Sequence, residues 1–310
     1  MIEIYKMYDV AIVGCGPAGL NAALYCARFG LKTILFCVQE GGMISEAAVV
    51  ENYLGFKQIE GRALIENFLR HVKSYDVEIV HEGVDKIEKK NGIFLVNGKY
   101  ESRSIILACG SRKKKLGIEG ESEFIGKGVS YCAVCDAPLY RDKVVAVIGG
   151  RNSATSSALH LANFAKEVYL VYRRGKLRAD KVLVNKVMEN EKIKLVLEAV
   201  PIKIKGDKFV EELVFEQKGE EKSIAVDGIF IEIGIEPCNA LAVMLGVEID
   251  EEGYIIVDHG MKTNVKGVFA AGDLTNVPLK QIIVAAAQGA IAAASAKDFL
   301  LENESVRKRD

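Results

Sequence analysis

The amino-acid sequence predicts an α/β protein with two Rossmann-like, three-layer units, the second inserted into the first. Three observations support this fold class. Apolar strands alternate with amphipathic helices, a glycine-rich turn follows an N-terminal strand at residues 14–19, and the same strand–turn–helix–strand pattern recurs from Val144 to Tyr172. The two glycine turns begin 135 positions apart (149 − 14), so the chain contains the unit twice.

The first unit begins with a strand over Tyr8–Val13, a near-continuous apolar run of the kind found in strands buried on both faces. A helix follows from Ala18 to Phe29, because its apolar residues share one face and Gly30 stands at its C-terminal end. The next strand is expected over Lys32–Phe36.

The glycine turn between these elements has the form Gly14-Cys15-Gly16-Pro17-Ala18-Gly19. Gly14 permits the tight turn, Gly16 lets backbone N–H groups approach a pyrophosphate, and Gly19 lets helix and strand pack closely. The helix N-terminus adds a partial positive charge. The alternative is a tight βα turn without a ligand. The acidic residue expected at the end of the second strand is absent and Phe36-Cys37 stands there, which favours FAD held by other contacts over a simple NAD site.

Later elements complete the two units. Further strands are expected at Ser104–Cys109, Ile224–Ile233 and Val268–Ala271, and a C-terminal helix at Gln281–Leu301. The basic segment Arg112–Lys115 and the Leu245-Gly246 pair are candidate boundaries. The expected domains are therefore 1–112 with 246–310, and 113–245. The charged tail, residues 302–310, is expected to fray.

The second glycine turn departs from the fingerprint because Arg151 occupies its middle glycine position. An arginine there crowds the pyrophosphate, although a guanidinium can also pair with phosphate. Three arginines after the second strand, Arg173, Arg174 and Arg178, suit a ribose 2′-phosphate and hence NADPH. The alternative is a solvated basic surface.

Between the two turns lies Cys132-Ala133-Val134-Cys135-Asp136, for which three interpretations compete. A zinc site would need a second Cys or His pair, and the remaining cysteines and four histidines form no cluster, so no metal is expected. Buried inert thiols are the second interpretation. A redox dithiol is favoured, because the pair can close a small disulfide loop. Asp136 could transfer protons, or could be a helix cap or turn residue.

The other five cysteines are isolated in the sequence, and we expect them to be buried small hydrophobic residues. For Cys15, inside the glycine turn, size rather than thiol chemistry is expected to matter. An odd total of seven cysteines argues against a disulfide scaffold and for a reducing, cytoplasmic location. The net charge of −1 gives no reason to expect nucleic acid or an anionic membrane as partner. The sequence also suggests no signal peptide and no apolar run of about 18 residues.

With these motifs in place, the whole chain resembles the low-molecular-weight thioredoxin reductases of the FAD-dependent pyridine nucleotide-disulfide reductase group. Three further stretches carry the resemblance: Gly41-Gly42-Met43 followed by residues 50–56, the segment 126–136 around the cysteine pair, and the segment 263–273 that ends in Ala-Ala-Gly-Asp. The resemblance implies a homodimer that passes electrons from NADPH through FAD and a dithiol to thioredoxin or a glutaredoxin-like protein.

The resemblance also implies a role for each matching residue. Cys135 would face the flavin, Cys132 would attack the partner disulfide, and Asp136 would donate and accept the proton. The residues implied in FAD binding are Gly14, Gly16, Pro17, Ala18, Gly19, Cys37, Gly42, Met43, Asn52, Val84, Gly110, Gly272, Asp273, Lys280, Gln281 and Ile282. Those implied in nicotinamide binding are Gly149, Gly150, Arg151, Asn152, Ser153, Ala154, Arg173, Arg174 and Arg178.

The chain departs from the family pattern at four places: Ala137 replaces a glycine, Tyr172 a histidine, Ser156-Ser157 a glutamate pair, and Arg151 a glycine. The last three fall in the nicotinamide unit. Two alternatives therefore stay open: a flavin and dithiol reductase with another donor, such as ferredoxin, and a nucleotide-binding redox sensor without turnover.

Overall fold

The computed structural model describes residues 6–47 and 50–307 of the 310-residue chain. The chain divides into two compact units, Met1–Arg112 with Glu236–Asp310 (unit 1) and Lys113–Ile235 (unit 2). The second boundary lies ten residues earlier than the sequence analysis places it (246 − 236). The reason is α6 (Ala240–Met244), because its residues Leu241 and Ala242 pack into the core of unit 1.

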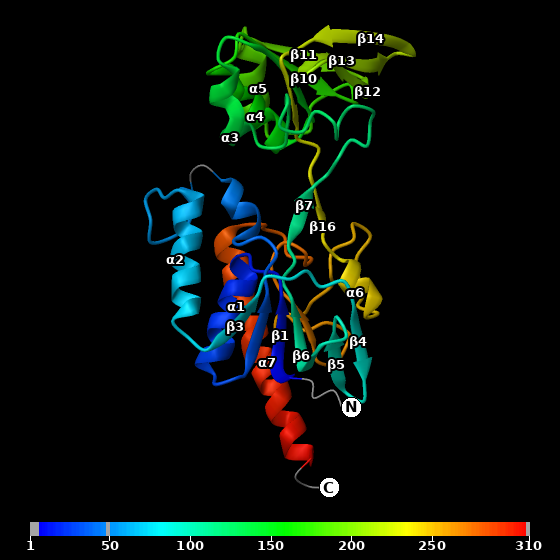
Figure 1. The fold of residues 1–310 in the computed structure, drawn as a ribbon. Coiled ribbons are helices and arrows are strands. Elements are labelled where there is room, and N and C mark those ends of the chain that lie inside the picture. The colour runs from blue at the N-terminus through cyan, green and yellow to red at the C-terminus, as the bar shows by residue number, and fades with distance from the viewer. Residues whose placement is uncertain (1–5, 48–49, 308–310) are drawn as a thin grey trace. The chain divides into compact units, whose positions relative to one another are not determined.

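Unit 1 is built on a seven-stranded sheet in the order β3-β2-β1-β6-β5-β4, with β17 pairing with β6 (Figure 1). Its strands are β1 (Lys6–Val13), β2 (Thr33–Phe36), β3 (Val77–Val80), β4 (Ile87–Lys90), β5 (Ile93–Val96), β6 (Tyr100–Leu107) and β17 (Val268–Ala270). The central strand β1 is parallel to β2 and β6, and Val13 is in register with Phe36 and Leu107. The carboxyl ends of these three strands therefore lie side by side, which is where α/β sheets bind ligands.

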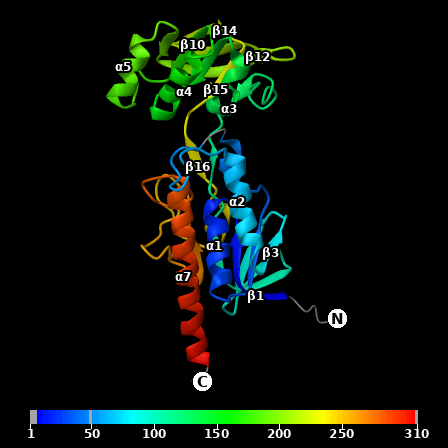
Figure 2. The same cartoon turned by 90° about the vertical axis from the view of Figure 1, so that its left-hand side faces the viewer.

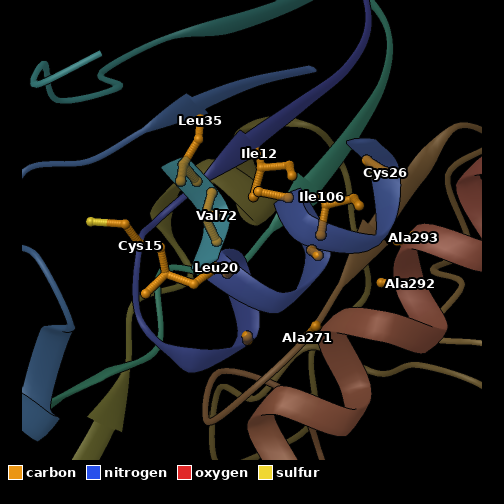
Figure 3. Close-up of a cluster of buried hydrophobic side chains, with 14 of the residues drawn as sticks. Ile12, Cys15, Leu20, Cys26, Leu35, Val72, Ile106, Ala271, Ala292 and Ala293 are labelled. Carbon is orange, nitrogen blue, oxygen red and sulfur yellow. The ribbon is translucent and has the colours of Figure 1, made fainter. Parts of the chain in front are cut away.

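The helices of unit 1 pack on this sheet. They are η1 (Gly42–Glu46), α1 (Pro17–Arg28), α2 (Gly61–Lys73), α6 and α7 (Ile282–Arg307). One hydrophobic cluster includes residues of β1, β2, α1, α2 and α7, among them Ile12, Leu20 and Ala292 (Figure 3). A second cluster includes Tyr8, Phe36 and Phe94 together with α6. The sheet is thus covered on both faces, as its continuous apolar strands require.

The long helix α7 lies alongside α1 (Figure 2). Asn21 Nδ2 donates a hydrogen bond to the Ala286 carbonyl at 2.7 Å, and a Cβ placed on Gly289 would lie 2.0 Å from the Ala18 carbonyl oxygen. The residues Ile282–Asn303 are long and apolar enough to cross a membrane, contrary to the expectation from sequence. This property alone is weak evidence of a membrane span, because helices in a protein core share it. The close contact with α1 accounts for the apolar composition of α7.

Unit 2 repeats the parallel arrangement with a five-stranded sheet in the order β11-β10-β9-β15-β8, and adds a three-stranded sheet in the order β12-β13-β14. The strands are β8 (Val129–Ser130), β9 (Val144–Ile148), β10 (Glu167–Tyr172), β11 (Ile193–Leu197), β12 (Ala199–Gly206), β13 (Val210–Gln217), β14 (Glu220–Ala225) and β15 (Gly228–Ile231). Its helices are α3 (Ala133–Asp136), η2 (Ala137–Tyr140), α4 (Asn152–Ala162) and α5 (Lys181–Glu189). The chain passes between the units in β7 (Ser111–Lys113) and β16 (Ile235–Pro237), which pair with each other.

Two predicted elements need correction. The segment Ile224–Ile233 is not one strand, because Asp227 ends the antiparallel sheet: its carboxylate accepts a hydrogen bond from the Val144 amide at 2.8 Å, and β15 then joins the parallel sheet beside β9. The tail does not fray at residue 302, because α7 continues to Arg307. The last three residues, like residues 1–5, lie outside the described part.

Candidate functional site

The first glycine turn leaves an open space above Gly16. A Cβ on Gly14, whose φ is +106°, would lie 2.4 Å from the Ala108 carbonyl oxygen, and one on Gly19 would lie 1.7 Å from the Gly14 carbonyl oxygen. These two glycines are therefore required by packing. The nearest atom to a Cβ on Gly16 is the Gly41 carbonyl oxygen at 3.9 Å, and a Cβ on Gly42 would lie 3.7 Å from the Gly16 Cα. The open space between Gly16 and Gly42, called the cradle below, would be filled by side chains if these two residues were not glycines.

Other residues predicted to hold FAD lie in loops at the ends of unit 1 strands and at the start of α7. Asn52 Nδ2 donates to Gln281 Oε1 at 2.8 Å, which joins two distant segments. Gly110 has a φ of +66° and open space where a Cβ would stand. Ala18 and Gly272 are in contact, since a Cβ on Gly272 would lie 3.0 Å from the Ala18 Cβ. Met43 belongs to η1, and Val84 packs against the second cluster.

Asp273 is the acidic residue of this region. Burial raises the pKa of its carboxyl above the ordinary value, and the Lys280 ammonium partly opposes that rise. The carboxylate accepts no side-chain hydrogen bond from any residue that the structure describes. Lys280 lies 3.9 Å from the centre of the Tyr254 ring, its Nζ donates to the Thr275 carbonyl, and burial lowers its pKa. A half-buried carboxylate without a protein donor accepts hydrogen bonds and so fits the hydroxyl groups of a dinucleotide such as FAD, while the glycine turn fits its phosphates.

A disulfide links Cys15 to Cys37, which corrects the expectation that both are isolated hydrophobic residues. Cys15 lies in the glycine turn after β1, and Cys37 directly follows β2, so the register of the two strands brings them together. The adjacency of the first two strands was the signal in the sequence that could have revealed the pair. Cys26 is buried as expected, and burial raises its pKa to about 12. Cys109 and Cys238 are partly exposed, and burial raises the pKa of each.

The predicted dithiol is present in unit 2 as a second disulfide, Cys132–Cys135, with a Cα–Cα distance of 5.4 Å. Cys132 precedes α3, and its Sγ accepts a hydrogen bond from the Cys135 amide at 3.3 Å. Both cysteines are partly exposed, and Val134 between them is 51% exposed. Ala137 is fully buried in the core of unit 2, and its helical backbone (φ −50°, ψ −40°) does not require the glycine that the family has here. The arrangement permits thiol–disulfide exchange at the surface of unit 2.

Asp136 closes α3 and lies next to the disulfide in the chain. Its amide donates to the Cys132 carbonyl at 3.2 Å, and its side chain is partly exposed. Among its neighbours, Tyr140 has a pKa raised first by burial and then by the charges of Asp136 and Asp227. Asp136 thus directly follows Cys135 in the chain, and its partly exposed side chain makes it a candidate for proton transfer.

The second glycine turn is more crowded than the first. A Cβ on Gly149 would lie 2.2 Å from the Glu232 carbonyl oxygen, and one on Gly150 would lie 2.3 Å from the Tyr172 ring. Arg151 precedes α4 with an extended backbone and an exposed side chain. Ala154 is buried. The turn therefore differs from the first in carrying an aromatic ring and a guanidinium beside its glycines.

The loop after β10 folds against this turn. The Arg178 amide donates to the Gly150 carbonyl at 2.7 Å. Asn152 and Asp180 exchange two hydrogen bonds of 2.9 Å each. Arg173, Arg174 and Arg178 have exposed side chains. The structure thus brings Arg178 and the glycine turn together, and leaves the basic side chains free to meet an anion.

Sequence reasoning missed Glu232, a buried carboxylate at the end of β15. It accepts hydrogen bonds from Ser153 at 2.5 Å and Ser157 at 3.1 Å, and Lys113 Nζ lies 3.6 Å away. Ser157 is one of the two serines that replace the family's glutamates. A glutamate within an otherwise apolar strand end was the signal in the sequence, because such a residue is rarely buried without partners. Among the described residues no group of three potential metal ligands occurs.

The chain is similar to known proteins over nearly its whole length. Residues 8–289 match the family model described as pyridine nucleotide-disulphide oxidoreductase. Thioredoxin reductase from Peptoclostridium litorale is 42% identical, over 96% of this chain and 98% of that protein. The solved thioredoxin reductase from Lactococcus lactis is 38% identical, with a TM-score of 0.84 over 95% of this chain and 99% of that one. A ferredoxin-flavin thioredoxin reductase from Clostridium acetobutylicum is 36% identical, with a TM-score of 0.54 over 96% of this chain and 99% of that one.

Proposed function

We propose a function from the premise that the chain belongs to the pyridine nucleotide-disulphide oxidoreductase family. The function is that of a thioredoxin reductase, an FAD-dependent enzyme that reduces the disulfide of thioredoxin or of a glutaredoxin-like protein. The observation that carries the proposal is the partly exposed Cys132–Cys135 disulfide in unit 2 of a chain whose unit 1 has an open dinucleotide cradle. Full-length relatives that carry the name thioredoxin reductase support it.

The cradle between Gly16 and Gly42 would hold the pyrophosphate of FAD, and Asp273 would accept hydrogen bonds from its sugar-like chain. Asn52 and Gln281, already joined by a hydrogen bond, would close the loops around it. When bound, FAD supplies a carrier of two electrons between the donor and the disulfide. Each of these residues acts by binding and orienting that carrier.

The cysteine pair would act by two thiol–disulfide exchanges. The Cys132 thiolate attacks one sulfur of the partner disulfide and forms a mixed disulfide, releasing one partner thiolate. Cys135 then attacks Cys132, which re-forms the Cys132–Cys135 disulfide and releases the second partner thiolate. The Cys135 amide, 3.3 Å from the Cys132 sulfur, favours the thiolate of Cys132 by hydrogen bonding. Asp136 would give the leaving thiolate its proton.

The proposed donor is NADPH, since Arg173, Arg174 and Arg178 present exposed guanidinium groups after β10. A second candidate donor is a reduced ferredoxin. It is favoured by Arg151 and by the ring of Tyr172, which crowd the second glycine turn. We also infer a homodimer located in the cytoplasm. The support for this inference is the resemblance to the low-molecular-weight thioredoxin reductases, which implies both properties.

The proposal is tested by mixing the FAD-loaded protein anaerobically with NADPH and a bacterial thioredoxin, and by counting the thiols released. Several catalytic turnovers are expected, and none from the double variant Cys132→Ser/Cys135→Ser. A yellow protein that does not respond to NADPH, but turns over with reduced ferredoxin, would select the second donor. Absence of thioredoxin reduction with either donor would overturn the proposed function.

A further inference from the structure

The Cys15–Cys37 disulfide lies within the first dinucleotide-binding turn and is not part of the proposed exchange reaction. Cys15 separates the two glycines that shape the turn, and Cys37 stands at the end of β2. Both side chains are buried, with 3% and 0% of their surface exposed. In Figure 3, Cys15 lies at the edge of its hydrophobic cluster with its sulfur directed away from Leu20. A buried disulfide cannot exchange directly with a protein substrate, so it needs another explanation.

Cys15 anchors both ends of the segment 37–41. One anchor is the disulfide, and the other is the hydrogen bond that the Gly41 amide donates to the Cys15 carbonyl at 3.0 Å. The Gly14 amide also donates to the Phe36 carbonyl at 3.0 Å. Gly42, which follows this anchored segment, faces Gly16 across the cradle. The disulfide therefore fixes the two sides of the cradle relative to each other.

This inference rests on the proposed function, which places the pyrophosphate of FAD in the cradle between Gly16 and Gly42. We infer that the Cys15–Cys37 disulfide is a redox switch that controls the affinity of the site for FAD. The disulfide form holds the cradle ready for FAD, and the dithiol form releases the segment 37–41 and binds FAD more weakly. By linkage, bound FAD protects the disulfide from reduction by the same factor.

The redox step balances as a thiol–disulfide exchange with a small dithiol or disulfide. In closing, one cysteine thiolate attacks the disulfide of the oxidant and displaces a thiolate. The other cysteine thiolate then displaces the second, so the oxidant gains two electrons and the cysteines lose two. Opening is the reverse reaction with a dithiol. Because both sulfurs are buried, either reaction requires the turn to open, which a bound FAD would oppose.

The test compares FAD affinity in the two redox states of the wild-type protein. FAD-free protein is titrated with FAD, with and without dithiothreitol, and binding is followed by flavin fluorescence. We expect the Kd to rise about tenfold on reduction, within the usual range of coupling between sites. Cys15→Ser/Cys37→Ser should show the weaker affinity in both conditions. Cys26→Ser, which removes a buried free thiol from the neighbouring helix α1, should keep the wild-type response.

A second measurement follows the cysteines themselves. FAD-loaded and FAD-free proteins are treated with dithiothreitol, labelled with iodoacetamide and analysed by peptide mass spectrometry. At a fixed ratio of reduced to oxidised dithiothreitol, the equilibrium ratio of labelled dithiol to unlabelled disulfide at Cys15 and Cys37 should be about tenfold lower when FAD is bound, while labelling of Cys132 and Cys135 should not differ in this way. Equal Kd values for FAD in the two redox states of the wild-type protein would overturn this inference, even if Cys15→Ser/Cys37→Ser fails to fold. Failure to bind FAD in either state would instead overturn the proposed function.

Discussion

One local feature that distinguishes Cys132 from Cys135 is the hydrogen bond that the Cys135 amide donates to the Cys132 sulfur. That donor favours negative charge on Cys132 and suits it to attack a partner disulfide. Cys135 then remains as the residue that resolves the mixed disulfide. The assignment of the two sulfurs can be checked by replacing each in turn.

Cys132→Ser and Cys135→Ser should each abolish thioredoxin reduction and leave FAD bound, since exchange needs an attacking and a resolving sulfur. Because the resemblance implies that Cys135 faces the flavin, only Cys132→Ser should show the long-wavelength charge-transfer band of a thiolate with oxidised flavin. Cys238→Ser, which removes a partly exposed free thiol, serves as the control and should retain activity. A charge-transfer band in Cys135→Ser instead would reverse the assignment.

Arg151 is the residue that most affects the expected affinity for a nicotinamide cofactor. Its side chain is exposed, so the protein fold does not depend on it. Arg151→Gly should lower the Kd for NADPH about tenfold if the guanidinium and its Cβ block the pyrophosphate, because the glycine there allows close backbone approach. The preference for NADPH over NADH should not change, since it depends on the arginines after β10. Weaker binding in the variant would mean that Arg151 is a phosphate ligand.

At the scale of elements, the disulfide between the β1–α1 turn and the end of β2 restricts the unfolded chain. The two cysteines are 22 positions apart, for which the chain-entropy model gives about 3 kcal/mol of stabilisation. Reduction of the FAD-free protein should therefore lower its free energy of unfolding in urea by about 3 kcal/mol. Because reductant also opens Cys132–Cys135, the comparison is made in the Cys132→Ser/Cys135→Ser background. In that background the further change Cys15→Ser/Cys37→Ser should match the reduced protein and show no response to reductant. An unchanged free energy on reduction would show that the crosslink does not stabilise this element.

The contact between α1 and α7 gives a second prediction at this scale. An alanine usually stabilises a helix relative to glycine by roughly 0.5–1 kcal/mol. At Gly289 the sign should reverse, because the added Cβ would lie 2.0 Å from the Ala18 carbonyl oxygen and would push the helices apart. Gly289→Ala should lower the free energy of unfolding by roughly 2 kcal/mol. Ile291→Ala on the exposed side of α7 is the control, and a stabilising effect of Gly289→Ala would refute the packing argument.

The sequence predicts some elements well and others poorly, for reasons that particular residues make plain. The strands β1, β9 and β10 were found because a parallel strand buried on both faces is a continuous apolar run. The segment Ile224–Ile233 is also mostly apolar, but it is divided at Asp227, whose carboxylate accepts a hydrogen bond from the Val144 amide. The Cys15–Cys37 pair and the Glu232–Ser157 contact were missed because each joins distant segments whose adjacency depends on the sheet order.

At the scale of the whole molecule, each unit has a hydrophobic core of its own. The clusters around Ile12 and Phe36 belong to unit 1, and those around Phe230 and Phe215 belong to unit 2. The repeated glycine turns made this two-unit organisation predictable. The second boundary was misplaced because α6 looks like a connection in the sequence, while Leu241 places it in the core of unit 1.

The central claim is that the Cys132–Cys135 disulfide takes electrons from the flavin. An anaerobic titration of the FAD-loaded protein with dithionite tests it directly and independently of the natural donor. Wild type should take up two electrons more than the double variant Cys132→Ser/Cys135→Ser, because the two proteins differ only in the Cys132–Cys135 disulfide. If the wild-type protein takes up no more electrons per chain than the double variant, with Cys132 and Cys135 still protected from alkylation, the account is contradicted.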